Sequence, residues 1–313
     1  MDIVDRAEAL RTRLGEQMRQ GVLAFPLTSF TEDGEQVDVA GFATHLRRHL
    51  DTGAVALFVA CGTGEFPSLT EQEYRTVVRE AVTVTAGRAP VLAGAGYGWA
   101  QARRFVTIAA EEGVDGILLM PPYLARGSQS GMVEHVRRVA TTSELPLIVY
   151  QRDLMALTAA SVAELSGLPA VIGLKDGHSN FLELQRMQLA AGSGFLWFNG
   201  SLTAEMQYRP YASVGIAPYS SAVQSFLPEV SRAFFLAARE GDQARMDELL
   251  QGFFSPLVEI RDRVPGYAVA LVKAGARLRG EQVGPVRAPL VDPDGSDLDD
   301  LAALIETGLA LVR

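Results

Sequence analysis

Short apolar segments recur along the chain, and amphipathic segments of helical length follow them. The apolar segments scarcely alternate with polar residues, which is typical of parallel strands that are covered on both faces. Eight such segments occur, at residues 22–28, 54–60, 90–96, 116–122, 146–151, 171–176, 195–200 and 215–221. Helical patterns between them include residues 39–50, 70–84, 100–112 and 130–140. Eight βα units predict an α/β protein with a (β/α)8 TIM barrel; a doubly wound sheet, the main alternative, usually has fewer strands.

The two ends of the chain lie outside this repeating pattern. Residues 1–20 are charged and helical in pattern. The stretch Ala-Ala-Arg-Glu-Gly-Asp at 237–242 predicts a break after the eighth unit, and helical patterns follow at 243–263, 266–279 and 298–312. We therefore predict an N-terminal helical segment at 1–20, a catalytic barrel domain at 21–240 and a C-terminal helical domain at 241–313.

Composition and charge argue against several classes of protein. Apolar residues make up 48% of the chain and charged residues 21%, which is typical of a globular protein. The net charge of −9 argues against general binding of nucleic acids or anionic membranes, because both need a basic face. The single cysteine, Cys61, excludes an intrachain disulfide and a Cys-based metal cluster. With no apolar signal core and no uninterrupted transmembrane-length segment, we expect a cytoplasmic enzyme.

A lysine at the end of the sixth apolar segment is the first candidate for chemistry. Only two of the 28 basic residues are lysines, Lys175 and Lys273. A lysine amine forms an imine with a ketone, which an arginine guanidinium cannot do, and an apolar strand end is expected to lower its pKa. The alternative is a structural lysine that reaches solvent or pairs with Asp176. We expect Lys273, in the helical C-terminal part, to be structural.

Further polar side chains lie at the ends of other predicted strands. Because the active site of a TIM barrel lies at the carboxyl ends of its strands, these residues should lie around one opening. They are the Gly-rich loop of residues 61–65 (Cys-Gly-Thr-Gly-Glu), Tyr123, Tyr150 with Arg152, Lys175, Asn199, Ser220 and Ser221. The amides of the loop and the Thr63 hydroxyl could hold a carboxylate, although the loop could also be only a tight turn.

Each of the other candidates has a structural alternative. Tyr150, one strand before Lys175, is a candidate proton shuttle or a core tyrosine. Arg152 could bind a distal carboxylate or pair with the next residue, Asp153. Glu65 is expected to brace the loop or to bind a neighbouring chain. The pair Ser220 and Ser221 could cap the next helix.

Two motifs that often bind cofactors or metals are set aside. Residues 94–98 (Gly-Ala-Gly-Tyr-Gly) follow a strand but lack the full dinucleotide spacing. His45 and His49 have metal-ligand spacing on one helix face, but no glutamate base lies between them. We expect these histidines at the surface, and we predict neither a metal nor a cofactor.

With these residues in place, the chain resembles the superfamily of dihydrodipicolinate synthases and N-acetylneuraminate lyases. The order of GTGE-type loop, strand-5 tyrosine and strand-6 lysine carries the resemblance, from Phe25-Pro26 through the helical tail. Within the superfamily it most resembles the 5-dehydro-4-deoxyglucarate dehydratases, because Leu124 follows Tyr123 where the synthases usually have a second tyrosine. Gln151, where relatives usually have asparagine, and residues 178–180 (His-Ser-Asn) depart from the family pattern.

The resemblance implies a class I lyase that removes water and carbon dioxide from 5-dehydro-4-deoxy-D-glucarate to form 2,5-dioxopentanoate. It implies that Lys175 forms the imine, that Tyr150 transfers protons and that Gly62, Thr63 and Gly64 hold the carboxylate beside the ketone. The remaining substrate groups would be held by Arg152, Asn180, Asn199, Ser220 and Ser221. No cofactor is needed for this path.

Two alternatives remain open from the sequence. One is another imine-forming lyase or aldolase of the superfamily that acts on a different 2-oxo sugar acid, including a dihydrodipicolinate-synthase-like activity. The other is a non-catalytic protein that binds 2-oxo acids. In every case we expect a small-molecule ligand rather than nucleic acid or a membrane, and the resemblance implies a homo-oligomer, either a tetramer or a dimer.

Overall fold

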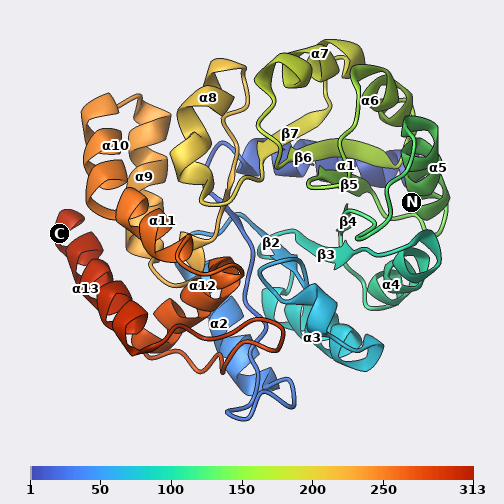
Figure 1. The fold of residues 1–313 in the computed structure, drawn as a ribbon. Coiled ribbons are helices and arrows are strands. Elements are labelled where there is room, and N and C mark those ends of the chain that lie inside the picture. Colours follow the sequence, from blue (N-terminus) through green and yellow to red (C-terminus); the bar gives the residue numbers. More distant parts are fainter. Residues whose placement is uncertain (1) are drawn as a thin grey trace. The chain divides into compact units, whose positions relative to one another are not determined.

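The computed structural model describes residues 2–313, in which strands and helices alternate through eight βα units. The fold class is a (β/α)8 TIM barrel with a C-terminal helical extension, as predicted. The strands are β1 (Leu23–Ala24), β2 (Ala56–Val59), β3 (Val91–Ala95), β4 (Gly116–Leu119), β5 (Leu147–Gln151), β6 (Val171–Asp176), β7 (Leu196–Asn199) and β8 (Ser220–Ser221) (Figure 1). Over the described residues, no helix is both long and apolar enough to cross a membrane.

The helices fall into two groups according to their place in the chain (Figure 1). Those that precede or alternate with the strands are α1 (Ile3–Gln17), α2 (Val39–Asp51), α3 (Glu71–Thr85), α4 (Trp99–Glu111), α5 (Gln129–Ala140), α6 (Ala159–Ser166), α7 (Phe181–Ala191) and α8 (Tyr208–Ser213). Those that follow β8 are α9 (Pro228–Glu240), α10 (Gln243–Leu249), α11 (Ser255–Arg261), α12 (Tyr267–Leu278) and α13 (Gly295–Leu311). Side chains of Asp, Ser, Thr or Asn at the residue before the helix cap many of these N-termini, as in α2, α3, α5, α6, α7, α10 and α13.

The chain divides into two compact units. The first unit comprises the residues up to Met18 and Pro90–Ser220, and the second comprises Arg19–Ala89 and Ser221–Arg313. The predicted limits at residues 20/21 and 240/241 divide the chain into consecutive domains, whereas each of these units combines separate stretches of the chain. The predicted domain limits therefore stay a prediction. The predicted break at 237–242 falls where α9 ends and Gly241, with a φ of 73°, leads into α10.

In the first unit, β3 to β7 pair in parallel and in chain order. Their side chains are almost all buried, which agrees with the continuous apolar runs in the sequence. The N-terminal helix α1 packs on the same unit: a Cβ added to Gly116 at the start of β4 would lie 2.7 Å from the side chain of Leu10. Leu10 and Leu14 of α1 are buried there.

In the second unit, β1 pairs in parallel with β2, and the helices after β8 contact one another. The predicted helix at 243–263 is α10 and α11 joined by a π-helical turn at Leu250–Phe254. Pro256 follows this turn, and because proline has no N–H to continue the α-helical hydrogen bonds, the widened turn has a physical cause. Gly308 of α13 permits a close approach, since a Cβ there would lie 2.7 Å from the ring of Phe253.

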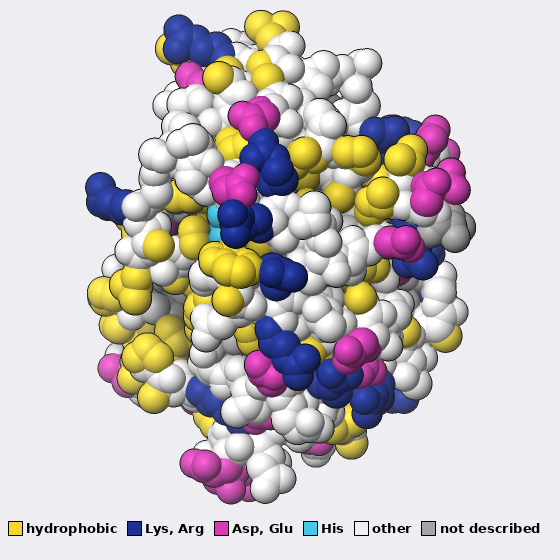
Figure 2. Space-filling view, turned by 90° about the vertical axis from the view of Figure 1, so that its right-hand side faces the viewer, with side chains coloured by type: hydrophobic (Ala, Val, Ile, Leu, Met, Phe, Trp, Pro, Cys, Tyr) yellow, Lys and Arg dark blue, Asp and Glu magenta, His cyan; other side chains and the backbone are white. Residues whose placement is uncertain are grey.

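Charged side chains on the outside are mixed in sign. On the face drawn in Figure 2, Lys and Arg side chains lie next to Asp and Glu side chains rather than in a single basic field. In the first unit, for example, Glu134 of α5 binds both Arg137 and Arg138 at 2.7 Å. Exposed pairs of this kind contribute little to stability, so they serve solvation more than folding.

The histidine pair on α2 is buried, which corrects the expectation of surface histidines. The side chains of His45 and His49 are 1% and 2% exposed, and their Nε2 atoms are 3.1 Å apart. The Leu27 N–H donates to His45 Nε2 (3.2 Å), so the proton of His45 is on Nδ1, which donates to Glu281 at 2.5 Å. Periodicity places these residues on one face of α2, but only the chain packed against that face shows that it points inward.

Acid is expected to destabilise the protein through these two histidines. Burial lowers the pKa of His45 from 6.5 to about 3 and also lowers the pKa of His49. At a pH below 6.5 but above the lowered pKa, each histidine binds a proton in the unfolded chain and not in the folded chain. The free energy of unfolding therefore decreases as the pH falls below about 6.5, by up to about 1.4 kcal/mol per histidine and pH unit.

Urea denaturation at about pH 7.5 and about pH 5 measures this effect. For His49→Gln, which keeps a hydrogen-bond donor, the loss between the two pH values should be smaller than for the wild type by about 2 kcal/mol. Equal losses in the two proteins would contradict the assignment.

Candidate active site

The strand ends of the first unit bring three aromatic or basic residues to the same level of the sheet. In the parallel register, Tyr150 of β5 pairs with Lys175 of β6, and Lys175 pairs with Phe198 of β7. Because residues at one level of a parallel sheet point to the same face, these three side chains lie side by side. The sequence predicted that Tyr150 and Lys175 lie on neighbouring strands, and this is confirmed.

Lys175 lies in a mostly aromatic environment. Its Nζ is 4.4 Å from the ring centroid of Tyr150 and 5.9 Å from that of Phe198. The side chain is 6% exposed, so the amine lies at a buried strand end, as the apolar run preceding it predicted. A buried primary amine against aromatic rings can both act as a nucleophile and hold a cationic imine, because ring faces attract positive charge.

The hydroxyl of Tyr150 has defined partners next to this lysine. It donates to the carbonyl oxygen of Gly200 at 3.0 Å and accepts from Arg152 Nη1 at 3.3 Å. Burial raises the pKa of Tyr150 above its usual 10, although the Arg152 guanidinium opposes this shift. The residue is therefore a neutral phenol at physiological pH and can act as a proton donor.

Arg152 has more than one partner. Besides the Tyr150 hydroxyl, its Nε lies 3.4 Å from the carboxylate of Asp153. The pairing with Asp153 was one of the two alternatives left open from the sequence. The contact with Tyr150 was not predicted; it forms because Arg152 directly follows β5 and its side chain reaches back to a residue two positions earlier.

Gly200 is a site residue that the sequence did not single out. It follows β7, and a Cβ added to it would lie 2.4 Å from Cε and 2.5 Å from Cγ of Lys175. Its carbonyl oxygen is also the acceptor for Tyr150. The lysine side chain therefore occupies the space above a glycine, and the backbone there binds the neighbouring phenol.

Replacing Gly200 by alanine is expected to move the amine and to lower kcat. Any added side chain must displace Lys175, and a displacement of roughly 1 Å at a reacting atom costs about 10²-fold in rate. Steady-state kinetics on Gly200→Ala measures the loss. Gly98→Ala is the matched control, because a Cβ there would meet no atom within 4 Å and the φ of −66° suits alanine. A variant at Gly200 with wild-type kcat would contradict this assignment.

A second network lies at the next residue along each strand. The carboxylate of Asp176 accepts from Gln151 Nε2 at 2.5 Å, from the Tyr211 hydroxyl and from the N–H groups of His178 and Ser179. Asp176 is 1% exposed, so these bonds satisfy a charge that would otherwise be costly to bury. The network holds the end of β6 and thereby the backbone that carries Lys175.

Tyr211 of α8 is the part of this network that the sequence analysis missed. Its side chain is fully buried, and its hydroxyl lies within 3.2–3.3 Å of the hydroxyls of Ser179 and Ser201. Burial, with Asp176 as a further cause, raises the pKa of Tyr211 above its usual 10. No local sequence pattern marks Tyr211, because it reaches β6 from a helix that follows β7.

Two residues that depart from the family pattern, Gln151 and His178, make hydrogen bonds next to this network. Gln151 is buried, and besides its bond to Asp176 its oxygen accepts from the Leu157 N–H at 3.2 Å. His178 Nε2 lies 3.1 Å from the carbonyl oxygen of Met155. Both side chains connect the loop after β5 with the loop after β6.

Three predicted substrate-binding residues of the first unit have contacts within the chain. Asn180 is exposed and caps α7 by accepting from the Glu183 N–H at 3.3 Å. Asn199 is buried, and its amide accepts from the Ser201 N–H and donates to Ala204 O, both at 2.9 Å. The Ser220 hydroxyl donates to the carbonyl oxygen of Asn199 at 3.3 Å. Their role toward a substrate stays a prediction.

The remaining predicted site residues belong to the second unit. In the Gly-rich loop, Gly64 O accepts from the Thr28 hydroxyl at 2.7 Å, and Glu65 Oε1 binds Lys273 Nζ at 2.7 Å. The loop-bracing role expected for Glu65 and the structural role expected for Lys273 agree with this contact. Ser221 Oγ accepts from the Gln224 N–H at 3.2 Å, but the residue before the next helical turn is Ala222, so the serines do not cap it. The binding of a carboxylate by Gly62, Thr63 and Gly64 stays a prediction.

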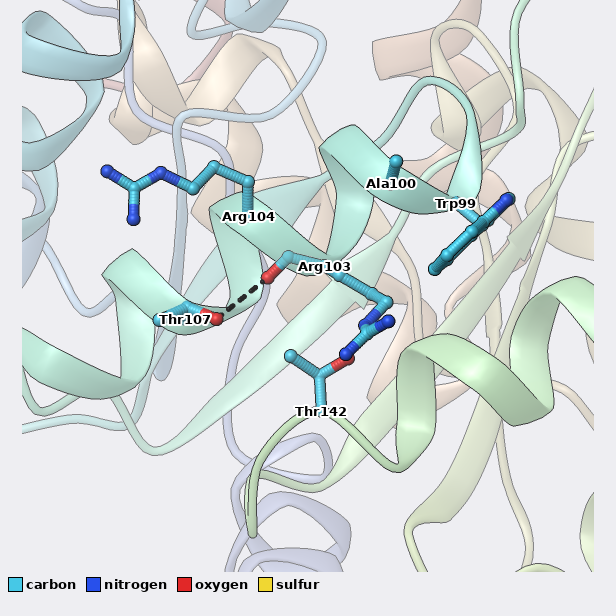
Figure 3. Close-up of a pocket in the computed structure, with 6 residues that line it drawn as sticks. All are labelled: Trp99, Ala100, Arg103, Arg104, Thr107 and Thr142. Atoms are coloured by element: carbon cyan, nitrogen blue, oxygen red, sulfur yellow. Dashed lines mark hydrogen bonds between the residues drawn. The ribbon is translucent and has the colours of Figure 1, made fainter.

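A hollow on α4 contains none of these candidates. It is lined by Trp99, Ala100, Arg103, Arg104, Thr107 and Thr142 and has a volume of about 310 Å³ (Figure 3). The Arg103 guanidinium lies over the Trp99 ring at 5.3 Å from its centroid. The hollow has no nucleophile or general base, so the imine chemistry considered for Lys175 has no place there. Among residues 2–313, no group of three or more His, Cys, Asp or Glu side chains could hold a metal ion.

Comparison with known sequences identifies relatives over nearly the whole chain. The model of the dihydrodipicolinate synthetase family matches residues 18–307. A Streptomyces coelicolor protein, named "Probable 5-dehydro-4-deoxyglucarate dehydratase 2", is 56% identical over 98% of this chain and 95% of its own. Its namesake in Streptomyces avermitilis is 54% identical over 97% of this chain and 92% of its own.

Solved structures of similar fold come from the same group. The dihydrodipicolinate synthase of Oceanobacillus iheyensis has a TM-score of 0.86 at 22% identity and covers 95% of this chain and 99% of its own. A prophage protein of E. coli K12, solved in complex with pyruvate, has a TM-score of 0.80 at 25% identity and covers 93% and 98%. The likeness to the first of these structures shows the fold alone.

Proposed function

The chain belongs to the dihydrodipicolinate synthetase family, and from this premise we propose that it is a dehydratase that acts through an imine on Lys175. The proposed substrate is 5-dehydro-4-deoxy-D-glucarate, which appears in the names of its 54–56% identical relatives. The proposed products are 2,5-dioxopentanoate, water and carbon dioxide. The expectation of a homo-oligomer rests on the family resemblance.

The single observation that carries this proposal is the placement of Lys175 beside Tyr150. A buried amine with its Nζ 4.4 Å from the ring of a neutral phenol combines a nucleophile with a proton carrier. Imine formation needs both, because the amine must lose a proton and the carbinolamine must lose water. The aromatic faces of Tyr150 and Phe198 would then attract the protonated imine.

In the first half of the reaction, the amine adds to the ketone and water leaves, so that a protonated imine replaces the carbonyl group. This cation acidifies the adjacent methylene, and loss of one proton gives an enamine. The enamine then expels the hydroxyl of the next carbon as water and regenerates a conjugated imine. Tyr150 is the proposed carrier for these protons, since its hydroxyl lies at the strand end beside the amine.

In the second half, the conjugated imine accepts the electron pair of the bond to the distal carboxylate, which leaves as carbon dioxide. Protonation of the resulting dienamine and enol gives the aldehyde, and water hydrolyses the imine to release the dioxo acid and the free lysine. Every electron pair moves between the substrate and the lysine imine, so each step balances without an external oxidant or reductant. The Gly-rich loop would hold the carboxylate beside the ketone.

Reductive trapping tests the proposal directly. The wild-type protein is treated with borohydride in the presence of 5-dehydro-4-deoxyglucarate, and its peptides are analysed by mass spectrometry. We expect a stable adduct on the peptide that contains Lys175. Its mass should lack carbon dioxide and a second water, besides the water that is lost when the imine forms. Trapping with pyruvate is the control for amine reactivity, since the solved E. coli relative holds pyruvate.

Other outcomes overturn the proposal in different ways. An adduct that has lost only the water of imine formation would indicate binding without elimination and hence a different substrate. Pyruvate among the products would indicate aldol cleavage by another lyase of the family. No adduct with this substrate, with pyruvate or with other 2-oxo acids would exclude the imine mechanism.

A further inference from the structure

The second lysine of the chain lies in an ion pair that is buried almost completely. The side chains of Lys273 and Glu65 are 0% and 1% exposed, and Lys273 Nζ is 2.7 Å from Glu65 Oε1. Lys273 belongs to α12, 208 positions after Glu65. A buried ion pair often contributes little net stability compared with an apolar pair of the same size, so its presence calls for another explanation.

Glu65 is the last residue of the Gly-rich loop, and its backbone is in a costly conformation. Its φ is 54°, in the left-handed region that residues other than glycine rarely adopt. The Glu65 N–H donates to Gly62 O at 3.1 Å, and the next N–H, that of Phe66, donates to Cys61 O at 3.0 Å. The loop is thus closed on itself, and Glu65 connects it to the rest of the unit.

Both carboxylate oxygens of Glu65 are bound by the C-terminal part of the chain. Oε1 accepts from Lys273, and Oε2 accepts from the backbone N–H of Arg287 at 2.9 Å. The Arg287 side chain in turn donates to Ser68 O at 2.8 Å and to the Glu73 carboxylate at 2.6 Å, both of which follow the loop in the chain. The last residue of the loop and the segment after it are therefore held by contacts to Lys273 and Arg287.

An aromatic ring closes the site around the lysine. Lys273 Nζ and the Arg287 guanidinium carbon each lie 4.0 Å from the ring centroid of Phe30. The pKa of Lys273 is lowered to about 8 by burial, while Glu65 opposes the shift, so the side chain is cationic at neutral pH. With its amine bound to a carboxylate and covered by a ring, Lys273 is not a second imine-forming residue.

We propose that Lys273 is a positioning residue, which acts through Glu65 to hold the Gly-rich loop in the conformation that binds the substrate carboxylate. This inference rests on the proposed function for its catalytic consequence, but the anchoring of the loop is measurable without any substrate. The backbone supports it: among the backbone–backbone hydrogen bonds of residues 2–313 outside helices and strands, none has the N–H of Thr63 or Gly64 as its donor, so neither group is used to close the loop on itself.

The first test is hydrogen exchange of the full-length protein in the absence of substrate. In Lys273→Met, which keeps the side-chain length and removes the charge, the peptide covering residues 61–66 should exchange at least about tenfold faster than in the wild type. Arg279→Met is the matched control, because it removes a cation at the end of the same helix. Arg279 Nη2 lies 2.6 Å from Glu229 Oε1, in a partly exposed ion pair. Exchange of the loop should be unchanged in this control.

The second test is kinetic. A loop that binds ground state and transition state alike should affect KM, so Lys273→Met and Glu65→Gln should each raise KM about tenfold or more while kcat stays within about threefold. The double variant Lys273→Met/Glu65→Gln should be no worse than either single variant, because both act through one contact. The double variant also removes both buried charges, so no unpaired charge stays in the interior. It therefore provides a folded protein if a single variant is unstable.

The outcomes separate this inference from the proposed function. Unchanged loop exchange in Lys273→Met and in the double variant would overturn the anchoring role. Faster exchange with KM unchanged, or a loss confined to kcat, would overturn the link to carboxylate binding. If the wild type forms no imine, the proposed function fails, whereas the exchange experiment still decides whether Lys273 holds the loop.

Discussion

Lys175→Arg is expected to lower kcat by roughly 10⁴-fold or more, because the variant keeps the positive charge but cannot form an imine. The charge matters to the comparison: Lys175 Nζ lies over the Tyr150 ring, and a guanidinium can keep that cation–π contact. Electrostatic binding of the substrate should therefore survive while covalent catalysis is lost.

The measurement is the steady-state rate together with borohydride trapping and the thermal midpoint. No adduct should form on the variant, and the unfolding temperature should stay within a few degrees of the wild type, since the buried stem of the side chain is retained. The arginine side chain is larger than lysine and would press against Gly200. Lys175→Met, which is unbranched and smaller than arginine, is therefore a second variant that should be inactive. Activity above a tenth of wild type in either variant would rule out Lys175 as the nucleophile.

Tyr150→Phe is expected to lower kcat by about 10²- to 10³-fold, the usual contribution of a positioned proton carrier. The ring contact with Lys175 remains, so binding of the imine cation is preserved and the loss should fall on proton transfer. Stability should decrease by only about 1 kcal/mol, because the bonds to Gly200 O and Arg152 are lost but no cavity is created. Tyr267→Phe, which removes the hydroxyl of a buried tyrosine in α12, is the control for that loss.

The pH dependence adds a separate check on Tyr150. Burial raises its pKa above 10, so the phenol stays protonated at every lower pH and acts as the proton donor. A decline of kcat between about pH 8 and pH 10 would therefore come from another group, and Tyr150→Phe should keep the shape of the wild-type profile there. Disappearance of that decline in the variant would assign it to Tyr150 and contradict the direction of the pKa shift.

The predicted strands were accurate where the chain forms a continuous ladder. The sixth segment was predicted at residues 171–176 and is observed as Val171–Asp176. The first and last strands are shorter than predicted, at Leu23–Ala24 and Ser220–Ser221. Pro26 and Pro218 supply the reason, because proline has no N–H for the ladder and an apolar pattern alone does not show where pairing stops.

Among the candidate site residues, those determined by strand position were predictable. Lys175 and Tyr150 each end an apolar run, and the parallel register then places them at one level. Gly200 was missed because its role depends on a lysine that lies on another strand. Tyr211 was missed because its hydroxyl reaches Asp176 from a helix 35 residues later in the chain.

The sequence by itself determined the alternation of strands and helices, and it identified an amine at one strand end and a phenol at its neighbour. Both follow from local periodicity, since side chains in strands and helices point in directions set by the backbone repeat. Only the tertiary structure decided which polar and charged side chains are buried in pairs. His45 and His49 are buried, and Glu65 forms an ion pair with Lys273. The sequence does not show this, because the environment of a side chain depends on distant segments packed against it.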